Sequence, residues 1–85
     1  SIKKPAYPYF DKRKGHEGDV LLEAHVLADG CVETVKVLKS SRYEGLDGAA
    51  VKALRRAKFR PAVRGEKPVP SRVKVSIKFV LEDER

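Results

Sequence analysis

The chain has 85 residues, of which 41% are hydrophobic and 36% are charged, a balance typical of one folded domain rather than of a disordered chain. Its 19 lysines and arginines against 12 aspartates and glutamates give a formal net charge of +7. No apolar run approaches the ~18 residues of a membrane-spanning helix, and the first residues lack the apolar segment of a signal peptide. We therefore expect a cytosolic protein or a fragment whose targeting segment lies upstream.

The basic charge favours either plain solubility or a polyanionic partner. The basic residues are spread over the chain and aromatic residues make up only 7%, too few for an evident base-stacking platform, so no nucleic acid is expected as a partner. Cys31 is the single cysteine, which excludes a disulfide within the chain. We interpret it as a small apolar strand residue, although its place beside a turn also leaves an intermolecular crosslink open.

Residues 5–15 are predicted to form one short helix. Gly15 would end it, and Pro8 suits its first turn.

A β-hairpin follows. Residues 19–28 alternate between apolar and mixed positions, with Val20, Leu22, Ala24, Val26 and Ala28 on one face. Asp29-Gly30 supplies the turn, since glycine accepts positive φ without steric cost, and residues 31–40 return as the second strand. Because Val32 is out of phase with Val35 and Val37, we expect a bulge near Glu33 and Thr34.

A helix is predicted over residues 46–58, with Pro61 beyond its end. Its charges complement the helix dipole, acidic at the start and basic at the end. One apolar stripe at helical spacing consists of Leu46, Ala49, Ala50, Ala53, Leu54 and Ala57.

The last segment begins with a loop that Gly65, Pro68 and Pro70 should keep irregular. The final strand, residues 72–81, alternates more cleanly than any other segment of the chain. Its apolar face consists of Val73, Val75, Ile77, Phe79 and Leu81, and its other face carries Arg72, Lys74, Ser76, Lys78 and Val80.

This order of elements predicts an α+β fold. A right-handed crossover places the third strand beside the first, which gives a three-stranded antiparallel sheet of order 2-1-3 with the helix on one face. Both outer strands are then edges. The third is long and regular, so an extended peptide could add there.

Catalytic constellations are nearly absent from the sequence. His16 and His25 share no ligand spacing with Cys31 or with carboxylates, and we interpret both as surface histidines. Ser40 and Ser41 have no base nearby and are expected to bond local backbone. We therefore expect no enzyme activity, no catalytic residue, no metal and no cofactor.

The order and spacing of several short motifs resemble the C-terminal domain of TonB-family proteins over almost the whole chain. The motifs are Tyr7-Pro8, Glu17-Gly18, Gly30, Val32, Val35, Val37, Ser40-Ser41, Leu46-Asp47, Ala49-Ala50, Phe59 and Pro61-Ala62. The chain departs from the family pattern at Ala6, before the Tyr-Pro, and at Ala57, where many members carry an aromatic residue.

The resemblance implies that residues 1–85 form a single periplasmic domain of an energy transducer. Its membrane anchor and proline-rich linker would lie upstream, in the inner membrane and the periplasm, and would couple it to ExbB and ExbD. The domain would bind the TonB box of outer-membrane transporters, as in iron-siderophore uptake. The partner strand would add along Val73, Lys74, Val75, Ser76, Ile77, Lys78 and Phe79, with further contacts from Pro5, Tyr7 and Pro8.

Two alternatives remain open: a TolA-like or other TonB-like periplasmic module with a different partner, and a basic nucleic-acid-binding module. We expect a monomer rather than a dimer, since residues 5–15 would shield part of the surface.

Overall fold

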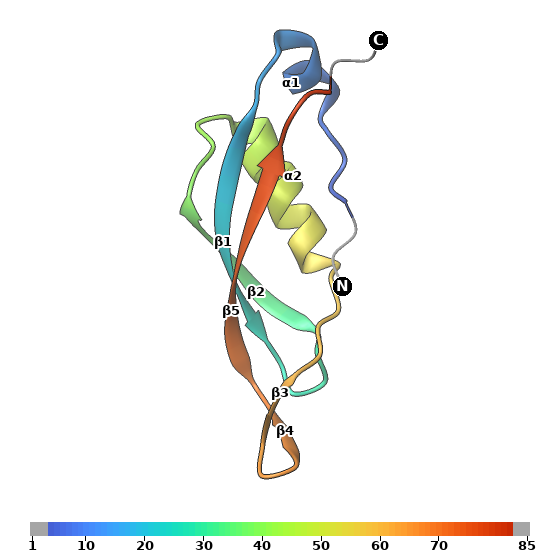
Figure 1. Ribbon diagram of the computed structural model, residues 1–85, viewed down its shortest axis with the longest axis vertical. Coiled ribbons are helices and arrows are strands. Elements are labelled where there is room, and N and C mark those ends of the chain that lie inside the picture. The colour runs from blue at the N-terminus through green and yellow to red at the C-terminus, as the bar shows by residue number, and fades with distance from the viewer. Residues whose placement is uncertain (1–3, 83–85) are drawn as a thin grey trace.

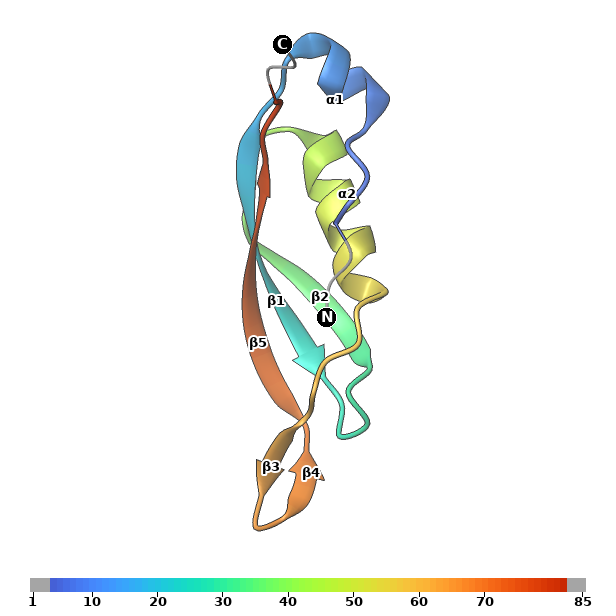
Figure 2. The same cartoon turned by 45° about the vertical axis from the view of Figure 1, so that its right-hand side comes forward.

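The computed structural model describes residues 4–82 and shows one helix lying across one face of a three-stranded antiparallel sheet (Figure 1). The sheet order is β2-β1-β5, which confirms the predicted order 2-1-3. Figure 2 shows that the helix covers one face of the sheet and leaves the other bare. The elements are α1 (Tyr9–Lys14), β1 (Gly18–Val26), β2 (Val32–Lys39), α2 (Glu44–Arg55), β3 (Ala62–Arg64), β4 (Lys67–Val69) and β5 (Ser71–Phe79).

The predicted N-terminal helix is present as α1. Gly15 ends it in the left-handed region at φ 72°, and its N–H bonds to the carbonyl of Lys12. Pro8 lies one position earlier than expected, because it is the N-cap with extended angles rather than a residue of the first turn.

The β1–β2 hairpin turns at the predicted position. Leu27 donates its N–H to the carbonyl of Cys31, Gly30 donates to Leu27, and Gly30 has φ 90°. A side chain at Gly30 would also collide with the carbonyl of Phe59, whose N–H donates to the Gly30 carbonyl at 2.9 Å. Glycine is therefore required there both by backbone angle and by close approach.

The predicted bulge is confirmed. The β1–β2 register shifts between His25, which pairs with Thr34, and Val26, which pairs with Val32, so that Glu33 is the extra residue. A second shift, which the sequence did not indicate, lies between Leu21 and Leu22. Ala28 is exposed in the turn rather than on the buried face, since β1 ends at Val26.

The helix α2 begins two residues before the predicted start and ends three residues before the predicted end. The earlier end coincides with tertiary contacts of the residues that follow. Lys58 forms an isolated β-bridge with Cys31, and the N–H of Phe59 donates to the carbonyl of Gly30, so both residues have extended rather than helical pairing. Leu46, Ala50 and Leu54 of the predicted stripe are fully buried.

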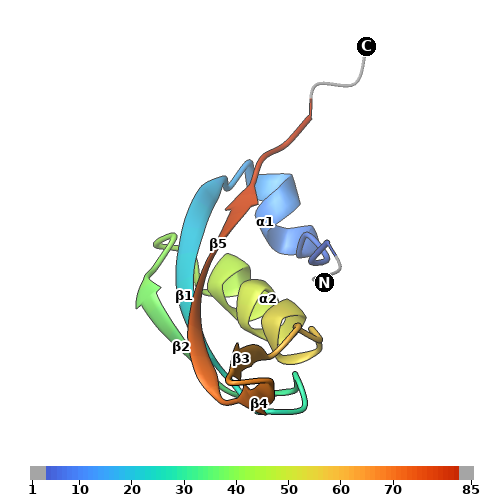
Figure 3. The ribbon, with the colours of Figure 1, turned by 60° about the horizontal axis from the view of Figure 1, so that its bottom comes forward.

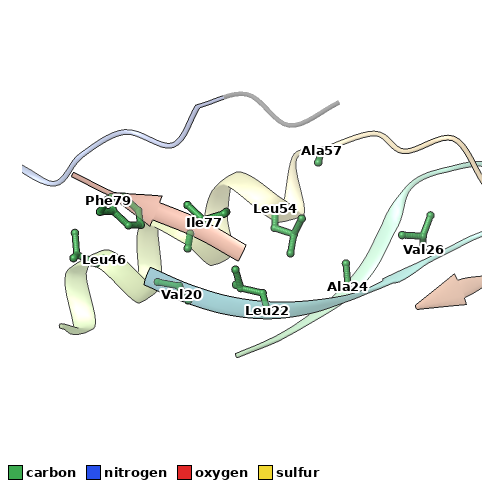
Figure 4. Close-up of a cluster of buried hydrophobic side chains, with 10 residues drawn as sticks. Val20, Leu22, Ala24, Val26, Leu46, Leu54, Ala57, Ile77 and Phe79 are labelled. Carbon is green, nitrogen blue, oxygen red and sulfur yellow. The ribbon is translucent and has the colours of Figure 1, made fainter. Parts of the chain in front are cut away.

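The core lies between α2 and the covered face of the sheet (Figure 4). Burying each large aliphatic side chain there contributes about 1.5–3 kcal/mol. Its buried members are Val20, Leu22, Ala24, Val26, Leu46, Ala50, Leu54, Ala57, Ile77 and Phe79.

The expectation of an irregular loop before the last strand was wrong. Residues 62–69 form a two-stranded hairpin, β3–β4, in which Val63 pairs with Pro68. Gly65 and Glu66 both have positive φ, at 54° and 69°, as a two-residue type I′ turn requires. The hairpin is largely exposed, so no alternating apolar pattern marked it in the sequence. Among residues 4–82, no helix combines the length and apolar character needed to span a membrane.

Candidate functional site at the free edge of the sheet

The outer edge of β5 is the longest regular edge of the sheet. All nine residues of β5 pair with β1 without a register shift, from Gly18 opposite Phe79 to Val26 opposite Ser71. Within the described part of the chain, no strand pairs with the other side of β5. The opposite edge, β2, is interrupted by two register shifts, which make it a poorer template for strand addition.

The alternation of main-chain groups along a strand identifies the β5 residues that face this edge. The N–H of Leu27 points toward β2, because it donates to Cys31. The even-numbered residues of β1 therefore direct their N–H and C=O groups toward β5. Their partners in the register are the odd-numbered residues, from Ser71 to Phe79. It follows that Arg72, Lys74, Ser76 and Lys78 direct their main-chain groups to the open edge.

The side chains of β5 divide between the two faces as the sequence predicted. Ile77 and Phe79 are buried under α2, and Val73 and Val75 are half-buried there. The basic row on the bare face consists of Arg72, Lys74 and Lys78, all exposed. Its charge is partly offset, because Arg72 Nη1 lies 3.6 Å from Oε1 of Glu23 on β1.

The N-terminal segment before α1 contacts the C-terminal end of β5. The Tyr7 ring packs edge-on against Phe79, with centroids 5.4 Å apart and an interplanar angle of 87°. Its hydroxyl donates a hydrogen bond to the carbonyl of His16, and burial raises the pKa of Tyr7, with a further contribution from the charges of Glu17 and Asp11. Tyr7 thus ties the segment before α1 to the end of β5.

A groove of about 470 Å³ lies where these segments meet. Two of the three N-terminal residues predicted for partner binding, Pro5 and Tyr7, line it together with Lys78 and Phe79 of the edge strand. Pro8 does not line it and instead caps α1. Figure 3 shows the chain after β5 running out beside α1 at this end. The full lining is Lys4, Pro5, Tyr7, Lys12, Lys78, Phe79, Val80, Leu81 and Glu82.

Sequence reasoning missed the cluster that holds α1 against α2. The Asp11 side chain is buried, and its Oδ1 lies 2.8 Å from Nδ1 of His16. The His16 ring stacks on Tyr43, the residue before α2, with centroids 3.9 Å apart and an angle of 9°. Asp11 Oδ2 occupies the space that a side chain at Gly45 would need, in the first turn of α2, where the helix dipole favours negative charge.

The sequence indicated a surface histidine, but His16 is half-buried and its ring contacts Asp11 and Tyr43. No spacing in the sequence could have shown that it contacts Tyr43. His25 lies on the bare face of the sheet and bonds to Glu33, Nδ1 to Oε1, at 2.8 Å.

The serine pair bonds local backbone, as expected. Ser40 Oγ accepts from the N–H of Arg42 at 2.9 Å, and Ser41 Oγ accepts from the N–H of Tyr43 at 3.1 Å. Both hydroxyls donate to the carboxylate of Asp47, with no histidine involved. Among the side chains of residues 4–82, no group of three or more histidines, cysteines or carboxylates is arranged to hold a metal ion.

Comparison with known proteins gives one consistent result. The family model described as "Gram-negative bacterial TonB protein C-terminal" matches residues 3–81. Protein tonB2 of Pseudomonas aeruginosa is 51% identical over 77 residues, which cover 91% of this chain and 28% of that protein. Protein TonB of Vibrio cholerae is 35% identical over 79 residues, which cover 93% of this chain and 32% of that protein. The chain thus spans about a third or less of the length of these curated relatives.

Solved structures agree with the sequence comparison. The solution structure of the Pseudomonas aeruginosa TonB C-terminal domain superposes with a TM-score of 0.82 at 27% identity, covering 100% of this chain and 86% of the other. A Helicobacter pylori TonB C-terminal domain (residues 179-285) superposes with a TM-score of 0.71 at 30% identity, covering 94% of this chain and 72% of the other.

Proposed function

The chain belongs to the family of Gram-negative bacterial TonB C-terminal domains, and we propose that it is the periplasmic, partner-binding end of an energy transducer. Its partner is the TonB box of outer-membrane transporters, and the force it transmits drives active uptake. Upstream, an inner-membrane anchor and a proline-rich linker connect residues 1–85 to ExbB and ExbD. The regular, unpaired edge of β5 carries this proposal.

In this proposal the TonB box adds as a fourth strand beside β5. The outward main-chain groups of Lys74, Ser76 and Lys78 form the hydrogen bonds, and the intervening residues hold the strand on the core. Pro5 and Tyr7 extend the contact into the groove at the end of β5, and Pro8 positions them by starting α1. The edge residues are Val73, Lys74, Val75, Ser76, Ile77, Lys78 and Phe79.

Strand addition suits a domain that carries force. Each main-chain hydrogen bond contributes only ~1 kcal/mol net, but several along one strand share the load in parallel. Because the bonds use the backbone, they tolerate variation in the partner sequence, which allows one domain to serve several transporters.

The test is whether the N–H of Ser76 pairs with the partner. Ser76→Pro removes this outward N–H, and we expect a synthetic TonB-box peptide to bind it at least ~5- to 10-fold more weakly by calorimetry, the cost of one or more main-chain bonds. Ser76→Ala keeps the N–H and should bind as the parent does. Equal losses in the two variants would contradict backbone pairing.

A complementary experiment leaves the protein unchanged. N-methylation of alternate amides of the peptide blocks pairing for one parity of positions only, because main-chain groups alternate between the two sides of a strand. We expect N-methylation of the peptide amides that face β5 to abolish binding. N-methylation of the alternate amides, which face away from β5, should be tolerated. Tolerance of both would exclude strand addition.

A further inference from the structure

The end of the molecule formed by α1 exposes two adjacent aromatic side chains. Tyr9 is 72% and Phe10 64% exposed, the highest values among the large hydrophobic residues of the described chain. Single exposed apolar side chains are ordinary on protein surfaces. Two neighbouring aromatic residues on a six-residue helix, both turned away from the core, are less common and indicate a contact surface.

Two cations lie over these rings, and a third is exposed on the same helix. Lys12, Arg13 and Lys14 are all exposed. The Arg13 guanidinium lies 5.9 Å from the centroid of the Tyr9 ring, and the Lys14 ammonium 5.7 Å from that of Phe10. These two pairs line a shallow hollow of about 360 Å³.

The carboxylate within α1 is not part of this surface. Asp11 is 4% exposed and pairs with His16 on the inner side of the helix. Below, the name "α1 tip" denotes the surface of Tyr9, Phe10, Arg13 and Lys14.

The α1 tip lies at one end of an elongated molecule of 50 × 26 × 14 Å. The β3–β4 hairpin lies at the opposite end (Figures 1 and 2). A helix at such an end can touch a flat surface without obstruction from the rest of the domain.

We propose that the α1 tip binds the surface of a bilayer containing anionic phospholipids. Aromatic rings are favoured at the headgroup level of membranes, and lysine and arginine near an anionic surface each contribute about 1 kcal/mol. Two aromatic side chains cover far less than the ~800 Å² per partner of a specific protein interface, whereas a bilayer needs no matching shape. The binding is weak and reversible, as for other short interfacial helices.

This membrane contact is independent of the proposed strand addition, since the residues of the α1 tip line neither the β5 edge nor the groove at its end. It holds the domain at the membrane while the β5 edge stays free. A failure of lipid binding would leave the TonB-box experiment unaffected, and the reverse also holds.

A tryptophan reporter tests the position of the contact, because the chain contains no tryptophan. Phe10→Trp places the reporter in the α1 tip, and Val63→Trp places one at a residue of similar exposure, 63%, in the β3–β4 hairpin. With phosphatidylglycerol vesicles we expect a blue shift of the emission for Phe10→Trp and none for Val63→Trp. Pure phosphatidylcholine vesicles should shift neither, and an equal shift of both reporters would overturn the proposal.

Charge variants test the chemistry by vesicle co-sedimentation. Loss of two contacting cations in Arg13→Gln/Lys14→Gln should weaken binding to phosphatidylglycerol vesicles roughly 25-fold. The matched control Arg64→Gln/Lys67→Gln removes the same charge from the opposite end and should change binding less than about twofold. Equal effects would mean attraction by net charge alone, which overturns the assignment of the site.

The contribution of the two aromatic rings to vesicle binding is tested by the double variant Tyr9→Ser/Phe10→Ser. Circular dichroism and thermal unfolding verify that this variant is folded. Loss of vesicle binding by a folded variant supports the proposal, and unchanged binding contradicts it. If wild-type protein binds an acidic peptide through the α1 tip but not the vesicles, the occupant is a protein surface and the lipid proposal fails.

Discussion

At the scale of single residues, Asp47 decides the conformation of the loop between β2 and α2. Its Oδ1 accepts from the N–H of Ser41 at 2.9 Å and from the Ser41 hydroxyl at 2.7 Å, and its Oδ2 accepts from the Ser40 hydroxyl. Burial alone would raise the pKa of Asp47, but the hydrogen bonds from Ser40 and Ser41 outweigh it and lower the pKa. Arg42, held in this loop, has φ 81°.

We expect Asp47→Asn to lower the free energy of unfolding at pH 7 by about 1–2 kcal/mol, through weakened hydrogen bonds to a charged acceptor. Because the folded pKa is depressed, this stabilisation is present above the usual carboxyl pKa of ~3.9 and is lost as pH falls through the folded value. The deficit of the variant should therefore shrink between pH 7 and pH 3 in urea unfolding.

Asp19→Asn is the matched control for this change. Asp19 is exposed on β1, so its substitution should alter stability by less than about 0.5 kcal/mol at either pH. A deficit for Asp47→Asn that is the same at both pH values would contradict a role for its charge.

At the scale of elements, the contact between α1 and α2 depends on the absence of a side chain at Gly45. A Cβ there would collide with Oδ2 of Asp11, the buried carboxylate that pairs with His16. Gly48 lies in the same helix, and a Cβ added there would meet nothing within 4 Å. Substitutions at these two positions therefore distinguish the two effects. A change at Gly48 reports helix propensity alone, whereas a change at Gly45 also reports the packing of α1 on α2.

We expect opposite effects from alanine at the two glycines. Gly48→Ala should stabilise the domain by about 0.5–1 kcal/mol, the usual gain from replacing glycine inside a helix. Gly45→Ala should destabilise it by about 1–2 kcal/mol, because Asp11 must leave its buried position. Chemical denaturation measures both.

Asp11→Ala completes a double-mutant cycle. With the carboxylate gone, the Cβ at position 45 fits, so Asp11→Ala/Gly45→Ala should be no less stable than Asp11→Ala alone. Additive losses, or a stabilising Gly45→Ala, would show that the two residues do not interact as described.

At the scale of the whole molecule, the two free edges of the sheet govern self-association. The shifts in β2 disrupt its edge, whereas β5 is regular along its length. At the end of β5, Tyr7 packs on Phe79 and the N-terminal segment lines the groove there, so part of this edge is sheltered. Exposed regular edges otherwise favour pairing between copies or strand exchange.

We predict a monomer at low micromolar concentration, to be measured by multi-angle light scattering. Tyr7→Ser should loosen the segment from Phe79 and shift the protein toward a dimer as concentration rises. A stable dimer of the unaltered chain at micromolar concentration would contradict this prediction.

Most of the fold could be predicted from the sequence, because it follows from local periodicity. The alternation around Val20 and Val75 marked the buried faces, Asp29-Gly30 marked the hairpin turn, and the phase change at Val32 marked the bulge at Glu33. The strand order followed from the handedness of one crossover.

Tertiary structure alone decided the features that join distant segments. The contact of Asp11 and His16 with Tyr43 and Gly45 carries no periodic signal, and neither does the packing of Tyr7 on Phe79. The register between β1 and β5 decides that the main-chain groups of Lys74, Ser76 and Lys78 face the open edge, and the sequence of one strand does not determine that register. The physical reason is that periodicity reports only which face of an element is buried, whereas these features depend on which elements meet.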